Sequence, residues 1–263
     1  MLVSLELTMV TTTSKIYLNK EAKVDHAKLP DLFLDGEELK LHSVKVNGNI
    51  VPTDAFTVNN ASLTVQGSFL QPYFTTTAAT ATADTAIELE TVVEVHPDKN
   101  LALSGLYKSG DNLLCTQCEA MGFRRIAFHQ DRPDILTKYK VYLEADKEKF
   151  PVLLSNGNQI STGILATDSS KHFAIWEDPF PKPSYLFALV AGNLESIHDT
   201  YVTTSGRSVR LGIYSEKRNA AKLDHAMYSL KRSMIWDEKT FGLECDLDIY
   251  NVVATDDFNM GAM

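Results

Sequence analysis

Hydrophobic and polar residues alternate in short runs through most of the first 190 residues of the chain. Alternation with a period of two residues is typical of strands that bury one face. Asparagine-rich and glycine-rich pairs separate several runs and favour tight turns or hairpins. These turn signals are Asn47-Gly48, Asn59-Asn60 and Asn156-Gly157. The pattern predicts an antiparallel, sandwich-like or barrel-like domain made mainly of β-strands.

The pattern changes after Gly192. Two strand-like segments precede a stretch in which hydrophobic residues recur at helical spacing from Leu223 to Met234. Gly242 is the expected end of this helix, and the following "LDIYNVVATDDF" again has the composition of a strand. The order β-β-α-β predicts the start of an α+β domain. We therefore expect two domains, residues 1–192 and residues 193–263.

Length, charge and cysteine content narrow the class of protein. The chain has 263 residues and a net charge of −9, which argues against binding to nucleic acid or to an anionic membrane surface. No apolar run approaches the roughly 20 residues that a membrane-spanning helix needs. Three cysteines are too few for a disulfide framework, and the N-terminus has no basic secretory leader. The few cysteines favour reduced thiols and a cytoplasmic protein, and we expect a monomer.

Motifs of common catalytic centres are missing from the sequence. The seven histidines are separated by at least 16 positions, so no two can share a helix face as metal ligands. Cys115 and Cys118 have the spacing of a redox pair or of half a zinc site. Cys245 is the only other thiol, and a thioredoxin-like pair requires a helix directly after a strand. Two unreactive thiols are the simpler interpretation, with a redox role as an alternative.

A dense polar stretch follows Gln117. Its first carboxylate, Glu119, is a candidate functional residue. Its other charged residues are Arg124, Arg125, Asp131, Arg132 and Asp134. A solvated, ion-paired loop is the ordinary interpretation of such a stretch. A single glutamate in a loop of this kind is most often a surface residue.

Four blocks in this sequence resemble the aminopeptidase N family, and they occur in family order. They are "LALSGLYKSGDNLLCTQCEAMGFRRIAFHQDRPDILTKY", "ADKEKFPVLLSNGNQI", "DPFPKPSYLFALVAGNL" and "MIWDEKTFGLECDLDIYNVVATDDFNMGAM". The resemblance covers residues 30–263 and is closest to the long form of bacteria and protists. This family consists of zinc metallo-aminopeptidases of the thermolysin-like superfamily, the gluzincin clan. The resemblance therefore implies a hydrolase that removes N-terminal amino acids from peptides.

The resemblance also implies a fold and a set of substrate-binding residues. The fold would be a mainly β, sandwich-like or saddle-like N-terminal domain, followed by the incomplete β-β-α-β start of a thermolysin-like catalytic domain. Glu119 would bind the α-ammonium of a substrate. Gln117 and Met260 would line the pocket for its first side chain. Gly261, Ala262 and Met263 match the start of the Gly-Ala-Met-Glu-Asn substrate strand, which continues past Met263 in the family.

The zinc motif of the family, His-Glu-x-x-His, does not occur in these 263 residues. We therefore expect no catalytic residue, no bound zinc and no activity in the chain by itself. We also expect the apolar helix stripe to find most of its partners outside the chain. Two alternatives to an aminopeptidase portion stay open. One is a stand-alone β-rich module that binds peptides or proteins, and the other is a thiol redox protein that uses Cys115 and Cys118.

Overall fold

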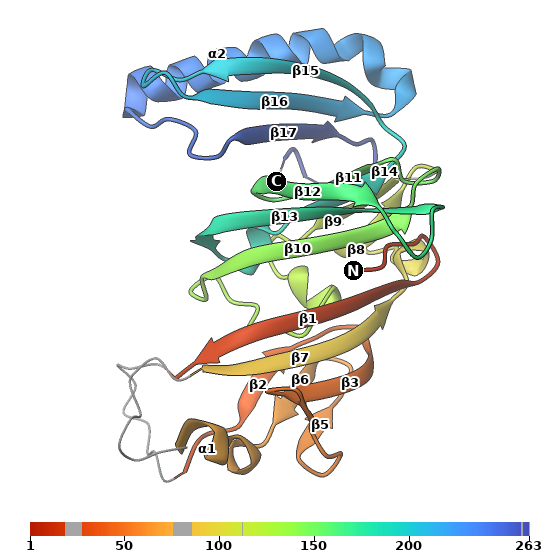
Figure 1. Ribbon diagram of the computed structural model, residues 1–263, viewed down its shortest axis with the longest axis vertical. Helices are drawn as coiled ribbons and strands as arrows, with labels where there is room; N and C mark the ends of the chain where they lie inside the picture. Colours follow the sequence, from red (N-terminus) through yellow and green to blue (C-terminus); the bar gives the residue numbers. More distant parts are fainter. Residues whose placement is uncertain (19–27, 76–85, 112, 259, 263) are drawn as a thin grey trace. The chain divides into compact units, whose positions relative to one another are not determined.

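The computed structural model describes residues 1–18, 28–75, 86–111, 113–258 and 260–262. The fold is mainly β, with several antiparallel sheets and one long helix near the C-terminus (Figure 1). This confirms the predicted fold class. The chain divides into two compact units. Unit 1 comprises Met1–Leu106, Gln117–Leu136 and Pro183–Leu186, and unit 2 comprises Tyr107–Thr116, Thr137–Lys182 and Phe187–Met263.

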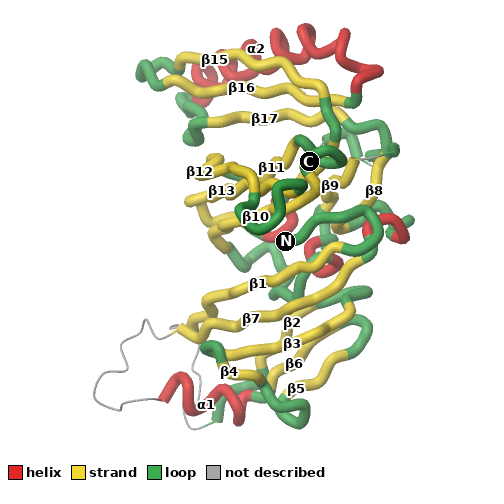
Figure 2. The backbone as a smooth tube through the Cα atoms, turned by 45° about the vertical axis from the view of Figure 1, so that its right-hand side comes forward, coloured by secondary structure: helices red, strands yellow, loops and turns green. Residues whose placement is uncertain are grey.

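Unit 1 contains two antiparallel sheets, with strand orders β1-β7-β3-β4 and β2-β6-β5 (Figure 2). Asn47 and Gly48 have φ angles of 49° and 80°, as a two-residue hairpin turn requires, so the predicted hairpin between β3 and β4 is confirmed. Helix α1 (Gly67–Thr75) was not predicted. The strands are β1 (Thr8–Tyr17), β2 (Leu32–Asp35), β3 (Lys40–Val46), β4 (Asn49–Ile50), β5 (Phe56–Val58), β6 (Ser62–Val65) and β7 (Ala86–Val95).

Unit 2 contains three sheets, with strand orders β10-β13-β12, β11-β14-β9-β8 and β15-β16-β17. Strand β8 starts and β9 ends with residues assigned to unit 1. The strands are β8 (Gly105–Ser109), β9 (Leu113–Gln117), β10 (Thr137–Asp146), β11 (Val152–Ser155), β12 (Asn158–Ile164), β13 (Lys171–Lys182), β14 (Leu189–Gly192), β15 (Glu195–Val202), β16 (Ser208–Ser215) and β17 (Ile249–Ala254).

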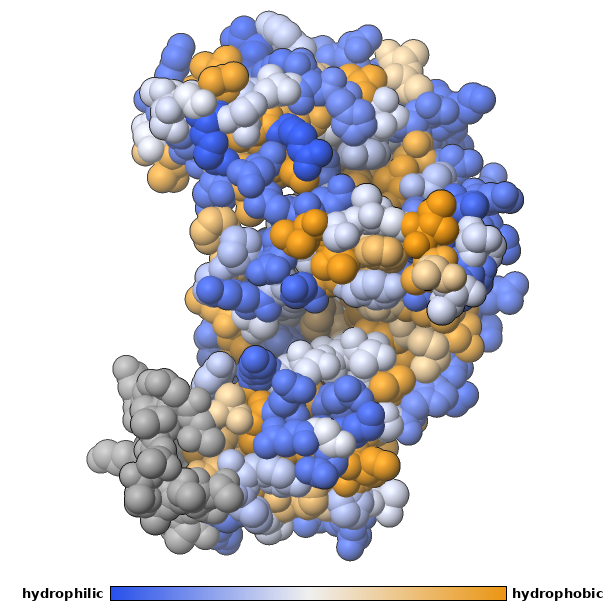
Figure 3. Space-filling view, viewed as in Figure 1, coloured by the Kyte–Doolittle hydropathy of each residue, from blue (hydrophilic) through white to orange (hydrophobic). Residues whose placement is uncertain are grey.

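Short 3-10 turns complete the secondary structure. They are η1 (Pro97–Lys99), η2 (Phe123–Arg125), η3 (Ser184–Leu186) and η4 (Lys217–Lys222). On the face in Figure 3, blue hydrophilic and orange hydrophobic side chains are mixed rather than separated into two regions. None of the described helices is long and apolar enough to cross a membrane.

Helix α2 (Leu223–Phe241) packs on strands β15 and β16 and forms a core of its own. It ends at Gly242, which has a left-handed φ of 67° as a helix C-cap often does. Both the helix and its end were predicted. The expectation that most partners of its apolar stripe lie outside the chain was wrong, because Leu223, Met227 and Met234 are buried in this core. The core members are Tyr201, Val209, Leu211, Ile213, Leu223, Met227 and Met234.

Glu94 on β7 is a buried carboxylate with three cationic or imidazole neighbours. Its oxygens accept hydrogen bonds from Lys40 Nζ at 3.1 Å, from His42 Nε2 at 2.9 Å and from His96 Nε2 at 2.9 Å. The hydrogen bonds from His42 and then Lys40 are the main causes that lower the pKa of Glu94 from 4.5 to about 2. The ionised form is therefore favoured in the folded chain.

We expect Glu94 to make the stability of the chain depend on pH. A carboxylate whose pKa is lower in the folded state stabilises the fold above its ordinary pKa. That stability should be lost as the pH falls from about 4.5 to about 2. Glu94→Gln should make the fall shallower over this window. Urea unfolding at a series of pH values measures it, and an unchanged pH dependence in the variant would contradict the assignment.

Candidate functional site

Gln117 and Glu119 lie at the end of strand β9, where the chain leaves the sheet. All five residues of β9 are buried, and Gln117 is 1% exposed. Its Oε1 atom accepts a hydrogen bond from the Glu119 backbone N–H at 2.6 Å, whereas Glu119 itself is exposed. A buried amide therefore fixes the backbone of an exposed carboxylate. Both residues were predicted substrate contacts, and the hydrogen bond links them directly.

The turn after Glu119 depends on a glycine. The Gly122 N–H donates to the Cys118 carbonyl at 2.7 Å, which returns the chain on itself. A Cβ atom at Gly122 would lie 2.5 Å from the Gln117 carbonyl oxygen and 2.9 Å from the Gly105 nitrogen. These distances are shorter than a side chain tolerates, so the close backbone approach requires glycine.

The polar stretch beyond the turn is tied into unit 1 by two arginines. Arg124 Nε donates to Asp131 Oδ2 at 2.9 Å, and its backbone N–H donates to the same oxygen at 3.2 Å. Ser184 also hydrogen-bonds the Asp131 carboxylate, whose side chain is only 1% exposed. Arg125 pairs with Glu37 and Glu38. The interpretation of this stretch as a solvated loop was wrong at Arg124, Arg125 and Asp131, and holds for the exposed pair of Arg132 and Asp134.

The segment that leads to Met260 is bound to strand β8 within unit 2. The Asp257 carboxylate accepts from the Gly110 N–H at 3.1 Å and from Ser109 Oγ at 3.3 Å. The Tyr107 hydroxyl donates to the Asp257 carbonyl at 2.8 Å. Sequence reasoning did not single out these contacts, because their partners are about 150 positions apart and no local pattern links them.

Met260, Gly261 and Ala262 are exposed after this anchored segment. A Cβ atom at Gly261 would meet no atom within 4 Å, so the packing of the described residues does not require a glycine there. Met263 was predicted as a site residue and lies outside the described residues. Met260, Gly261 and Ala262 belong to unit 2, whereas Gln117 and Glu119 belong to unit 1.

The two thiols of the Cys-x-x-Cys sequence are buried, at 2% exposure for Cys115 and 0% for Cys118. Burial is the main cause that raises the pKa of Cys115 to about 11, and burial also raises the pKa of Cys118. Cys115 lies within strand β9, and a turn rather than an α-helix follows. Thiolates are the reactive form of cysteine, so these features argue against a redox function.

No three His, Cys, Asp or Glu side chains in the described parts of the chain are grouped so that they could hold a metal ion. The family resemblance implies zinc, but these residues do not supply its ligands.

A family model, the Peptidase M1 N-terminal domain, matches residues 3–186. The chain belongs to the M1 peptidase family. Among curated M1 relatives, it is 45% identical to aminopeptidase N of Caulobacter vibrioides over 252 residues, which is 96% of this chain and 27% of that protein. It is 48% identical to aminopeptidase N of Escherichia coli over 232 residues, which is 88% of this chain and 24% of that protein. The chain thus spans about a quarter of the length of these relatives.

Two solved structures agree with the fold. A crystal structure of Legionella pneumophila aminopeptidase A in complex with aspartic acid matches with a TM-score of 0.82 and 32% identity, over 96% of this chain and 27% of that one. Native yeast LTA4 hydrolase matches with a TM-score of 0.69 and 17% identity, over 99% of this chain and 37% of that one. At this low identity, the match shows a shared fold alone. The resemblance to the aminopeptidase N family is confirmed. The site residues and the boundary at residue 192 stay predictions.

Proposed function

We propose that this chain is the N-terminal portion of a zinc-dependent aminopeptidase and helps to recognise the free N-terminus of a peptide substrate. The observation that carries the proposal is the 45% identity to aminopeptidase N over 96% of the chain. We assign the metal ligands to the part of the relatives that this chain does not span. A zinc ion bound there would polarise the scissile carbonyl and activate water.

The local structure of Glu119 supports a role in binding an ammonium group. The carboxylate is exposed, while the backbone that carries it is fixed by buried Gln117. A charge-assisted hydrogen bond between a carboxylate and an ammonium contributes about 1.5–3 kcal/mol. A blocked N-terminus would lose this bond, which would select exopeptidase substrates over internal peptide bonds.

Within unit 2, Met260 and Gly261 suit contacts with the side chain and the backbone of a peptide ligand. Met260 is 41% exposed, and its unbranched thioether could adapt to side chains of different shape. The space around Gly261 is open, which would allow an extended peptide to approach the backbone as an added strand. The Legionella relative is described in complex with aspartic acid, which supports amino acids and peptides as the ligand class. We propose a monomeric cytoplasmic enzyme.

A stand-alone binding module remains the second candidate, and one observation favours it. The segment after Gly192 forms a core between α2, β15 and β16 from its own residues, so it does not depend on other chain segments for that packing. Such a module would bind peptides without cleaving them.

Fusion to a relative separates these candidates. The chain would be joined after Met263 to the portion of Caulobacter vibrioides aminopeptidase N that follows the aligned region. We expect a zinc-containing enzyme that hydrolyses leucine anilide but not its N-acetylated form, while the 263 residues alone hydrolyse neither. Circular dichroism checks that the fusion is folded, and metal analysis measures its zinc content. A folded, zinc-loaded fusion that cleaves neither substrate, or both equally, would contradict the proposal.

A further inference from the structure

A cavity of about 420 Å³ lies within unit 2, between the β15-β16-β17 sheet and residues of β11, β12 and β13. Alternation along β16 places Leu211 and Ile213 in the core with α2 and turns Arg210, Gly212 and Tyr214 to the opposite face. The cavity is within the size range of small-molecule sites. It is separate from the residues proposed to bind a peptide N-terminus.

Gly212 forms the floor of this cavity. A Cβ atom at Gly212 would lie 2.6 Å from Asn251 Oδ1 and 2.7 Å from Tyr214 Cε2. The side chains of Asn251 and Tyr214 therefore lean across the strand in space that only glycine leaves open. A glycine inside a strand commonly marks a close approach of this kind.

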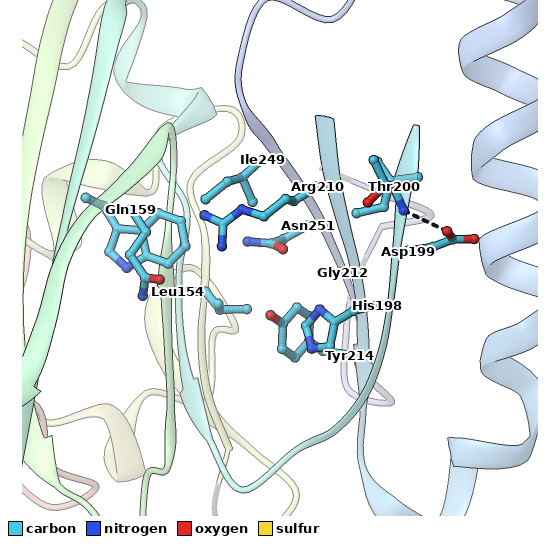
Figure 4. Close-up of a pocket in the computed structure, with 12 residues that line it drawn as sticks. Leu154, Gln159, His198, Asp199, Thr200, Arg210, Gly212, Tyr214, Ile249 and Asn251 are labelled. Atoms are coloured by element: carbon cyan, nitrogen blue, oxygen red, sulfur yellow. Dashed lines mark hydrogen bonds between the residues drawn. The ribbon is translucent and has the colours of Figure 1, made fainter. Parts of the chain in front are cut away.

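Three polar groups line the cavity beside this glycine, namely the Arg210 guanidinium, the Asn251 amide and the Tyr214 hydroxyl. None of the three makes a hydrogen bond or ion pair with another side chain in the described part of the chain. In Figure 4, Arg210 and Asn251 lie side by side and point towards Gln159. The Tyr214 ring lies against the His198 ring, with 5.6 Å between centroids.

Among the described residues that line the cavity, Arg210 carries a permanent positive charge and makes no ion pair. Asp199 is the only acidic residue of the lining, and it pairs with Lys231 and points towards helix α2 (Figure 4). Burial raises the pKa of the Tyr214 hydroxyl, with Arg210 acting in the opposite direction. The hydroxyl therefore keeps its proton at neutral pH and can donate a hydrogen bond. Arg210, Asn251 and Tyr214 can thus all donate hydrogen bonds to one acceptor.

We propose that this cavity binds a small organic carboxylate. A guanidinium presents parallel N–H groups that match the two oxygens of a carboxylate, and Asn251 and Tyr214 supply further donors. Leu154 and Ile249 give the cavity apolar walls for the rest of the ligand. One cation balances one negative charge, whereas a phosphate dianion would be left with excess charge. An organic cation would meet Arg210 without a free carboxylate to pair with.

Phenylacetate and its uncharged amide, phenylacetamide, test the proposal on the complete 263-residue chain. Ligand-observed NMR titration should give phenylacetate a dissociation constant of roughly 1 mM. Phenylacetamide should bind at least about tenfold more weakly, because it lacks the charge that Arg210 recognises. No saturable binding of phenylacetate, or equal binding of the acid and the amide, would overturn the proposal.

Matched variants locate the binding. Arg210→Met and the isosteric Asn251→Asp, which places a carboxylate beside Arg210, should each weaken phenylacetate binding about tenfold or more. Arg232→Met is the control, because Arg232 lies on α2 and contacts Tyr228, and it should bind as the parent does. Thermal unfolding confirms that each variant is folded. Unchanged binding in Arg210→Met and Asn251→Asp would show that phenylacetate sits elsewhere, and would refute the assignment.

Discussion

Glu119→Gln, introduced into the fusion with the Caulobacter enzyme, is expected to lower kcat/KM for leucine anilide by about 10- to 100-fold. The substitution keeps the size of the side chain and removes its charge. One charge-assisted hydrogen bond to the substrate ammonium would become a weaker neutral one. The zinc content should not change, because Glu119 is assigned to the substrate and not to the metal.

Glu148→Gln is the matched control for this experiment. Glu148 is an exposed carboxylate in the turn between β10 and β11, so its loss removes the same charge from the chain elsewhere. Its kcat/KM should stay close to that of the parent fusion. If Glu119→Gln and Glu148→Gln had the same effect, Glu119 would have no special part in binding the substrate.

Asp131→Ala should lower the free energy of unfolding of the 263-residue chain by about 3–5 kcal/mol. The substitution removes the acceptor of two hydrogen bonds from Arg124 and one from Ser184. Arg124, whose side chain is 20% exposed, would keep its charge with the longer 3.5 Å pair to Asp35 and a neutral hydrogen bond to the Asp131 backbone carbonyl at 3.1 Å. A largely buried cation that loses its closest partner is strongly destabilising.

Asp134→Ala provides the comparison. Its carboxylate pairs with Arg132 at 2.7 Å, but both side chains are more than half exposed. Exposed ion pairs contribute at most about 1 kcal/mol. The free energy of unfolding of this variant should therefore stay close to that of the parent chain. Urea denaturation of the three proteins measures the difference. Similar midpoints for Asp131→Ala and Asp134→Ala would mean that the buried network adds little to stability.

Local patterns in the sequence predicted most of the strands and helix α2. Asn47-Gly48 specified a hairpin because its two residues adopt the positive φ angles that few others accept. Asn156-Gly157 has the same signal, and Gly157 also has a positive φ of 84°. It nevertheless connects β11 to β12, which belong to different sheets. A turn signal in the sequence predicts the local backbone conformation but does not predict which strands pair.

Long-range contacts explain what the sequence did not reveal. The charged residues around Arg124 looked like a surface loop, since nothing near them indicates the partners Asp35 and Ser184. The helix stripe from Leu223 to Met234 was assigned partners outside the chain, although β15 and β16 supply them. Glu119 was proposed as a site residue through family resemblance, because one exposed carboxylate carries no distinctive local pattern.

The two units alternate along the chain, and this has a consequence for biosynthesis. Unit 1 resumes at Gln117 and again at Pro183, so Ser184 reaches Asp131 only after most of unit 2's central strands have been made. At a translation rate of about 5–20 residues per second, the residues from 107 to 186 take roughly 4–16 seconds to emerge from the ribosome. Throughout that interval the nascent chain carries an unfinished unit 1 and an unfinished unit 2. A ribosome that stalls anywhere in this stretch would release a polypeptide in which neither unit is complete.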